Sequence, residues 1–254
     1  MKFIYLLFAM LALISCKKSI KKTEQTSEKQ VGIGLLNVNT TSIIYLYKNE
    51  KDAKPIDSIS FKIKNNGSTK FITDIDLEPY KIFEGNTADE GKTNINMGLV
   101  HFGPSLKFRV IDSTKNAFKI MTNEKTYAFY YLRIEDKNAY YTTEQQLQDN
   151  NCIGCPNSKY NPNWFVFETW ERYLKRVAFA RKKTLQVYDQ PNGKIIFTDT
   201  ANNYIPFSIS QLKGDWVKIE KPYGTADETF KFNGWTRWKK KSEIIIEITE
   251  QLYD

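Results

Sequence analysis

Short runs of alternating apolar and polar residues, separated by turn residues, constrain the fold of this chain most strongly. The clearest run spans residues 58–64, where Ile59, Phe61 and Ile63 alternate with serine and lysine. A period of two places the apolar side chains on one face of a β-strand and leaves the other face to water. Similar runs recur at residues 41–47, 106–111 and 118–121. We therefore predict that residues 31–141 form an N-terminal β domain.

Residues 184–254 predict a second, smaller β unit with sharper turn signals. A strand that ends at Tyr188 precedes Asn192-Gly193, a pair that favours the positive backbone φ of hairpin turns. A Gly-Asp turn at residues 214–215 leads into a strand, and a Gly-Trp strand follows at residues 234–238. The chain as a whole is therefore predicted to be mostly β.

These blocks, in this order, resemble the bacterial Src-homology-3-like domain. The matching positions are residues 187–193, 214–219 and 234–238, and the resemblance covers residues 184–246. The loop at residues 221–232 is longer than the pattern, and Trp238 adds an aromatic residue that the pattern does not require. The resemblance implies a small barrel whose aromatic side chains line a shallow groove and stack on peptide or sugar.

The binding residues implied by this resemblance are aromatic, together with one arginine that meets a carboxylate. They are Tyr188, Trp216, Tyr223, Trp238 and Arg237. We predict that Trp216, Tyr223 and Trp238 are exposed to a ligand, and that Trp235 belongs to the core.

The N-terminal domain has two interpretations, a divergent copy of the C-terminal barrel or an unrelated β-sandwich. In a copy, Leu46-Tyr47 would match Val187-Tyr188, residues 118–120 would match 217–219, and residues 130–132 would replace Gly-Trp-Thr. The copy requires an insertion at roughly residues 71–101. Both interpretations stay open at this point.

Residues 142–183 differ in residue pattern from the strand-like segments on either side and are predicted to be a connector. Cys152-Ile153-Gly154-Cys155 is a tight turn, and apolar residues at helical spacing begin at Trp170. Thr169 can serve as the N-cap of this short amphipathic helix, since its hydroxyl can accept a hydrogen bond from the first helical turn.

The N-terminus carries an apolar run from Phe3 to Ser15 that follows Met1-Lys2 and precedes Cys16. The run is too short for a bilayer core, which needs about 20 apolar residues, and its basic start and small-residue end describe a secretory signal. It resembles a bacterial lipoprotein signal. The resemblance implies that residues 1–15 are removed and that Cys16 is acylated. An ordinary signal peptide with a cysteine nearby is the alternative.

Residues 16–30 are polar and are predicted to be a flexible tether. The whole chain has 37 Lys and Arg against 29 Asp and Glu, and residues 17–30 hold five of the lysines and two of the glutamates. This basic charge would lie beside the lipid headgroups, where each lysine adds about 1 kcal/mol of attraction to an anionic surface. We therefore predict a membrane partner and no nucleic-acid partner.

Cys152 and Cys155 remain as a pair once Cys16 is assigned to the lipid. In an exported protein, two thiols at this spacing favour a local disulfide, and a redox-active pair is the alternative. Redox activity needs a lowered thiolate pKa, and Pro156 after the motif offers no helix N-terminus. His101, the sole histidine, is interpreted as a packed strand residue. No catalytic residue, metal or cofactor is predicted.

These observations predict a non-enzymatic protein of the cell envelope, lipid-anchored on the periplasmic face of the outer membrane. Its C-terminal barrel would bind a peptide, peptidoglycan or a protein partner. An envelope thiol-disulfide enzyme that uses Cys152 and Cys155 is the first alternative, and a purely structural lipoprotein is the second.

Overall fold

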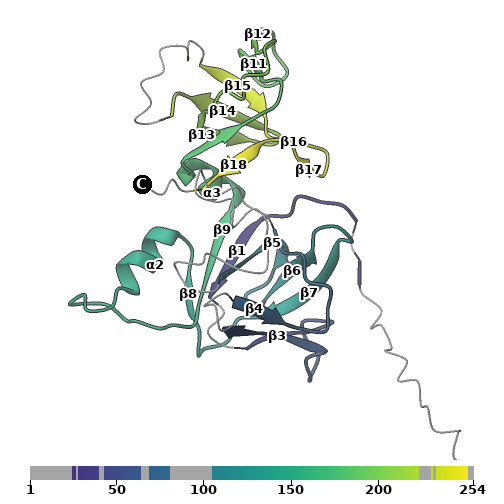
Figure 1. Cartoon of the computed structure of the whole chain (residues 1–254), viewed down its shortest axis with the longest axis vertical. Coiled ribbons are helices and arrows are strands. Elements are labelled where there is room, and N and C mark those ends of the chain that lie inside the picture. Colours follow the sequence, from purple (N-terminus) through teal and green to yellow (C-terminus); the bar gives the residue numbers. More distant parts are fainter. Residues whose placement is uncertain are drawn as a thin grey trace, which may run out of the picture.

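The computed structural model describes residues 25–26, 28–39, 43–63, 69–80, 105–222, 230 and 233–250. Within these ranges the chain is mostly β, as predicted, with several sheets and two short helices. The strands form two units stacked along the long axis of the molecule (Figure 1). None of the described helices is long and apolar enough to cross a bilayer. The predicted residues Cys16, His101 and Tyr223 lie outside the described ranges.

The first unit is built on a six-stranded sheet with the order β7-β6-β5-β1-β9-β8. A three-stranded sheet, β2-β3-β4, packs against it over a buried apolar cluster that includes Leu36, Leu46 and Phe108. The strands of this unit are β1 (Gly34–Asn39), β2 (Ile44–Leu46), β3 (Asp57–Ile63), β4 (Thr69–Ile72), β5 (Ser105–Ser113), β6 (Ala117–Asn123), β7 (Ala128–Arg133), β8 (Ala139–Tyr141) and β9 (Trp164–Thr169).

Strand β9 extends the first unit beyond the predicted boundary at residue 141. It pairs with β1 in an antiparallel register and with β8 in a parallel one. Residues 142–183 are therefore more than a connector. Phe165 and Val166 are both buried although they are neighbours. A strand that is buried on both faces has a continuous run of apolar residues in its sequence. It therefore lacks the alternation of apolar and polar residues by which strands with one exposed face are predicted.

The second unit contains a five-stranded antiparallel sheet, β12-β11-β15-β14-β13, and a two-stranded sheet, β10-β18. Ala180 of β10 bridges to Phe207, directly before β13. The described strands do not close into a barrel. The strands are β10 (Phe179–Arg181), β11 (Gln186–Tyr188), β12 (Ile195–Thr198), β13 (Ser208–Lys213), β14 (Trp216–Glu220), β15 (Gly234–Arg237), β16 (Lys239–Lys240), β17 (Glu243–Ile244) and β18 (Glu247–Thr249).

The two turns predicted for this unit join the strands as expected. Asn192 has a φ of 61° between β11 and β12, and Gly214 has a φ of 60° between β13 and β14. Positive φ is accessible to asparagine and costs glycine nothing, which explains why these residue types stand here.

The strand pairing of the two units corresponds residue by residue. In the first unit, Tyr47 bridges to Tyr131 of β7. In the second unit, Tyr188 of β11 pairs with Trp235 of β15. These are the residues that the copy interpretation aligns. The next strand pair has the same register in both units: β6 pairs with β7 as β14 pairs with β15, so Lys119 opposite Tyr131 corresponds to Lys218 opposite Trp235.

The correspondence continues through the rest of both units. β5 and β13 contain a bulge at matching places, after Val110 and after Ile209. The strand that opens each unit, β1 or β10, pairs with the strand that ends it, β9 or β18. With the isolated bridges included, the orders are β4-β3-β2-β7-β6-β5-β1-β9-β8 and β12-β11-β15-β14-β13-β10-β18, which agree apart from the two end strands β4 and β8 of the first unit. This agreement favours a copy over an unrelated sandwich.

Helix α3 (Trp170–Arg176) joins the two units. It begins after Thr169, whose side-chain oxygen accepts a hydrogen bond from the backbone N–H of Arg172, as predicted for an N-cap. The buried face of α3 lies in one apolar cluster with Leu35 of the first unit and Val187 of the second. The two units therefore share a hydrophobic core.

Candidate functional site

One face of the five-stranded sheet combines aromatic and cationic side chains. Trp235 pairs with Tyr188 on one neighbouring strand and with Lys218 on the other, so these three lie side by side. Side chains alternate along a strand, so Trp216 and Arg237 lie on this face as well. The opposite face is fully buried at Val187, Val217, Ile219 and Thr236. We call Tyr188, Trp216, Lys218, Trp235 and Arg237 the aromatic–cation face.

Arg237 covers Trp216 on this face. The guanidinium carbon lies 4.4 Å from the centre of the Trp216 ring, and the Tyr188 ring meets the same indole edge-on at 4.9 Å. Trp216 is consequently only 6% exposed, and the prediction that it is exposed is wrong. Arg237 also donates through Nη2 to Oδ1 of Asn192 at 3.0 Å. The arginine thus holds both an aromatic ring and the first loop of the unit.

Trp238 lies in the core, which corrects its predicted place in a ligand groove. It is 1% exposed, its ring centre is 5.4 Å from that of Trp170, and its Nε1–H donates to the carbonyl of Gly214 at 2.9 Å. Trp235 is half-buried on the outer face. Residues three apart on a strand point to opposite faces, so assigning Trp235 to the core placed Trp238 on the wrong side. Thr236 lies two residues before Trp238, so the two side chains point to the same face. The burial of Thr236 identifies that face as the core.

Lys182 adds a titratable cation beside this face. Its Nζ donates to the backbone carbonyl of Arg237 at 3.0 Å. Burial, assisted by the charge of Arg237, lowers the pKa of Lys182 to about 8. The positive charge near Arg237 therefore decreases as the pH rises past 8.

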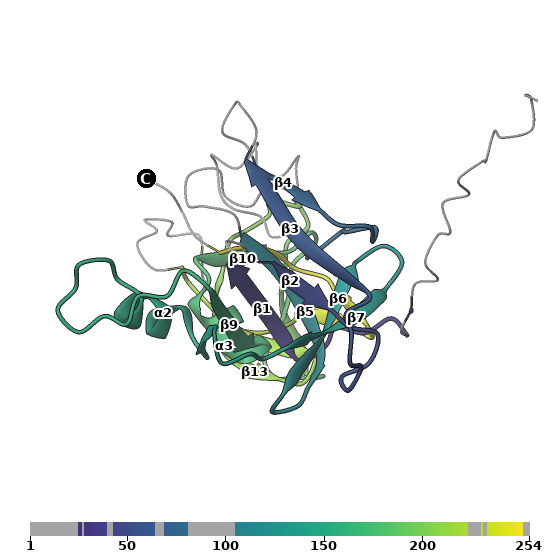
Figure 2. The same cartoon turned by 90° about the horizontal axis from the view of Figure 1, so that it is seen from below.

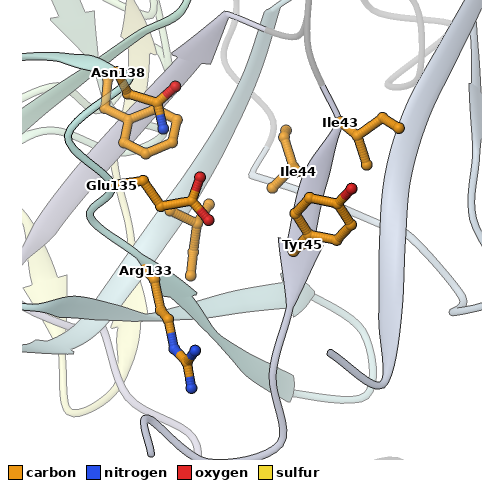
Figure 3. Close-up of a pocket in the computed structure, with 8 residues that line it drawn as sticks. Ile43, Ile44, Tyr45, Arg133, Glu135 and Asn138 are labelled. Atoms are coloured by element: carbon orange, nitrogen blue, oxygen red, sulfur yellow. The ribbon is translucent and has the colours of Figure 1, made fainter. Parts of the chain in front are cut away.

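A small cavity in the first unit does not provide a substrate site. It lies between β2 and the residues that follow β7, and Figure 3 shows Glu135 pointing toward Ile44 and Tyr45. Its volume is about 20 Å³. That is room for one water molecule, whereas small-molecule sites span about 300–1,000 Å³.

The cysteine pair lies on an arm that leaves the first unit after β8. Cys152 and Cys155 form a disulfide with Cα atoms 5.5 Å apart, as predicted. The arm includes helix α2 (Glu144–Asn150), which has no buried residue, and it projects from the body of the molecule in both Figure 1 and Figure 2. Cys152 follows the C-terminal end of α2, where the helix dipole disfavours a thiolate. This placement does not support a redox-active pair.

Loss of the disulfide is expected to have a small effect on global stability. In the chain-entropy model a loop of this size stabilises by about 2 kcal/mol, but only if the arm unfolds together with the rest of the chain. Because the arm is exposed and separate from the core, we expect it to open locally, and a C152S/C155S variant to lose less than about 1 kcal/mol. Denaturant unfolding of both proteins measures this. A loss of several kcal/mol would mean that the arm belongs to the cooperative unit.

A buried ionic cluster ties the end of the chain to the first unit. Glu250 is 7% exposed and pairs with Lys107 of β5 and with Nη2 of Arg176, which lies 2.8 Å away. Arg176 also donates to both carboxylate oxygens of Glu168, at 2.9 and 2.7 Å. The pKa of Glu250 lies below its ordinary value, because Lys107 and Arg176 outweigh the opposing effect of burial. An ionised, paired carboxylate of this kind stabilises the fold and is not a general acid.

A cationic groove of about 500 Å³ lies between the two units. Its walls include Lys29 and Ile33 from the segment before β1, and Lys239 and Lys241 from the hairpin of β16 and β17. Ile33 is 41% exposed. No carboxylate lines the groove among the described residues, although Lys29 is paired with Glu243 at its rim and Nζ of Lys239 lies 3.5 Å from Oδ1 of Asp215. The groove therefore suits an anionic surface.

No group of three His, Cys, Asp or Glu side chains in the described ranges is placed to hold a metal ion. Comparison of the chain with models of protein families, with curated proteins and with solved structures gives no match in any of the three. The aromatic–cation face and the cationic groove are the two described surfaces whose chemistry suits a ligand.

Proposed function

We propose that this protein is a lipid-anchored, non-enzymatic component of the cell envelope that binds peptidoglycan through the aromatic–cation face. The observation that supports this most directly is the row of Tyr188, Trp235 and Lys218 across three strands, next to Arg237. Aromatic rings stack on sugar faces, and cationic side chains meet the carboxylates of the peptides that the glycan carries. An open sheet face can accept an extended polymer without a deep pocket.

The second unit is, in this proposal, a bacterial Src-homology-3-like domain. The hairpin at Asn192, the turn at Gly214 and the pairing of β14 with β15 join the three sequence blocks in the order that the resemblance implies. The ligand face differs from the predicted groove, because Trp238 is replaced by Trp235 as the half-exposed tryptophan.

Binding to purified sacculi tests this function. A Trp235→Ser, Lys218→Gln variant is expected to bind at least about 10-fold more weakly than wild type, since it loses one stacking ring and one charge-assisted contact. Tyr160→Ser, Lys159→Gln is the matched control, because both side chains are exposed on the disulfide arm. Equal retention of the variant and the control, or no retention of the wild type, would exclude this face as the binding site. Retention by envelope proteins alone would favour a protein partner.

The membrane part of the proposal combines Cys16, the basic tether and the cationic groove. The predicted tether of residues 16–30 is too long, because Thr26 bridges to Ala128 of β7 and the carbonyl of Gln25 accepts from the backbone N–H of Phe129 at 3.0 Å. If Cys16 carries the lipid and the residues between it and Gln25 are flexible, their root-mean-square length would be about 17 Å. The groove that Lys29 lines would then lie near the headgroups. Its lysines and the exposed Ile33 are suited to the anionic lipid surface.

Vesicle binding tests the groove independently of acylation. For the chain from residue 16 with Cys16→Ser, neutralising Lys29, Lys239 and Lys241 as glutamine should weaken binding to phosphatidylglycerol vesicles at least about 10-fold, because each lysine contributes about 1 kcal/mol. Neutralising the exposed Lys48, Lys51 and Lys54 removes the same charge elsewhere and should change the affinity much less. Equal effects of the two variants would show that only net charge matters. Phosphatidylcholine vesicles should bind neither protein.

A further inference from the structure

We infer that the first unit carries a second ligand-binding face of the same chemistry, formed by Tyr47, Lys119, Tyr131 and Arg133. This inference rests on the proposed function of the second unit. It adds a site in a unit that has no recognised sequence motif, and it makes the chain bivalent.

The four residues occupy the positions that correspond to the aromatic–cation face. Tyr131 pairs with Lys119 and bridges to Tyr47, as Trp235 pairs with Lys218 and with Tyr188. The arginine follows two residues later in both units, at positions 133 and 237. Each unit therefore places a tyrosine, a second aromatic ring and a lysine in one row, with an arginine beside the row. Tyr47 is only 7% exposed, because Arg133 lies over its ring, whereas Tyr188 is half-buried.

The opposite faces of the same strands have diverged. Where the first unit has Phe118, Tyr130 and Leu132, the second has Val217, Gly234 and Thr236 at the matching positions. All six are buried, so packing has been rearranged between the units. Folding alone places few demands on the outer face of a sheet. Three of the four positions on that face keep the same residue type, and the fourth keeps an aromatic ring, as Tyr131 or Trp235, while the core changed. This indicates that the two faces share a task.

The two arginines also have matching local roles. The guanidinium carbon of Arg133 lies 3.8 Å from the centre of the Tyr47 ring, and its Nε donates to the carbonyl of Glu50 at 3.0 Å. Arg237 donates to Asn192 and also covers an aromatic ring, although that ring belongs to Trp216 of β14 and not to the tyrosine. In both units the arginine therefore positions the loop that follows the tyrosine. Tyr131 and Trp235 are half-buried and face the ligand, together with the lysines paired with them. Lys119 also lies over the Phe129 ring, with Nζ 3.9 Å from the ring centre.

Two faces of one chemistry suit a ligand that repeats. A glycan strand with carboxylate-bearing peptides offers the same unit many times, so one protein can engage two units at once. Linked binding of this kind can exceed the affinity of either site by about 10²–10⁴. The second face thus identifies the polymer, and not a single fragment, as the ligand that is bound tightly.

Titration with a soluble disaccharide–tetrapeptide fragment, released from sacculi by enzymatic digestion, tests the inference. The wild type is expected to bind two fragments per chain. Tyr131→Ser, Lys119→Gln and, separately, Trp235→Ser, Lys218→Gln are each expected to bind one, and the control Tyr160→Ser, Lys159→Gln is expected to bind two. Each single-face variant should also lose about 10²-fold in apparent affinity for intact sacculi. Tyr131→Phe keeps the ring and should retain both sites.

The outcomes separate this inference from the function on which it rests. One fragment per wild-type chain, with sacculus binding unchanged by Tyr131→Ser, Lys119→Gln, would overturn the second face and leave the first intact. Absence of wild-type binding to both fragment and sacculi would overturn both. Thermal unfolding of each variant verifies that the fold is kept, and a variant that has lost it is replaced by Lys119→Gln alone, for which the same two results apply.

Discussion

Replacing Glu250 with glutamine is expected to lower the free energy of unfolding by about 3 kcal/mol. Glu250 is buried between Lys107 and Arg176, and removing one partner of a buried ionic group leaves uncompensated charge in the protein interior. Because this group connects the end of the chain to β5 and α3, the loss should appear in the main unfolding transition. Denaturant unfolding monitored by tryptophan fluorescence measures it.

Glu247→Gln is the matched control for this substitution. Glu247 lies on β18, its side chain is 54% exposed, and its carboxylate is 3.9 Å from Arg181. An exposed pair of this kind contributes little, so the change should be below about 0.5 kcal/mol. Equal effects of the two substitutions would contradict the role given to the buried cluster.

The same group predicts a dependence of stability on pH. The pKa of Glu250 is lowered in the folded protein, so its contribution is present above its unfolded pKa of about 4.3 and is lost as the pH falls through the folded value. The wild type should therefore lose more stability than Glu250→Gln below about pH 4.3. Parallel loss in both proteins would mean that other carboxylates dominate.

Trp238→Ala is expected to cost about 4 kcal/mol, which would make it the most damaging single substitution that we describe. The side chain is 1% exposed, packs against Trp170 and donates a hydrogen bond to Gly214. Truncating a buried tryptophan leaves a cavity and an unpaired carbonyl, which together account for this size. Thermal or denaturant unfolding provides the measurement.

Trp235→Ala separates folding from binding. Trp235 is half-buried on the outer face, so its removal should cost about 1 kcal/mol while reducing binding to sacculi. Trp235 lies on β15 and Trp238 directly follows that strand, and the two substitutions should give opposite results. A stable Trp238→Ala variant that no longer binds sacculi would reverse the assignment of the two faces.

Local patterns predicted much of the fold because they act through neighbours in the sequence. The β character of both units, the Asn192 hairpin and the Thr169 N-cap each depend on a few adjacent residues, and each is present in the structure. The strand β9 was not predicted because its place in the sheet depends on pairing with β1, which is distant in the sequence. Its apolar run carries no periodic signal of its own.

The candidate site was predicted only in part, because side-chain exposure depends on strand parity and on neighbouring strands. Tyr188 and Arg237 lie on the predicted unit, but Trp216 is hidden by an arginine that pairs across the sheet. The sequence alignment of the two units was too weak to choose between a copy and a sandwich. The registers, which join Tyr47 to Tyr131 and Tyr188 to Trp235, are the basis of the proposed second face, and they are not readable from the sequence.

Site-specific photo-cross-linking in living cells tests the central claim most directly. A photoreactive benzoylphenylalanine at position 235 should, on irradiation, attach the full-length protein covalently to sacculi that survive boiling detergent, and digestion of the wall should release it. The same probe at the exposed position 160 should give no such attachment. Adducts with envelope proteins alone, or equal attachment from both positions, would contradict the proposal that this face binds the cell wall.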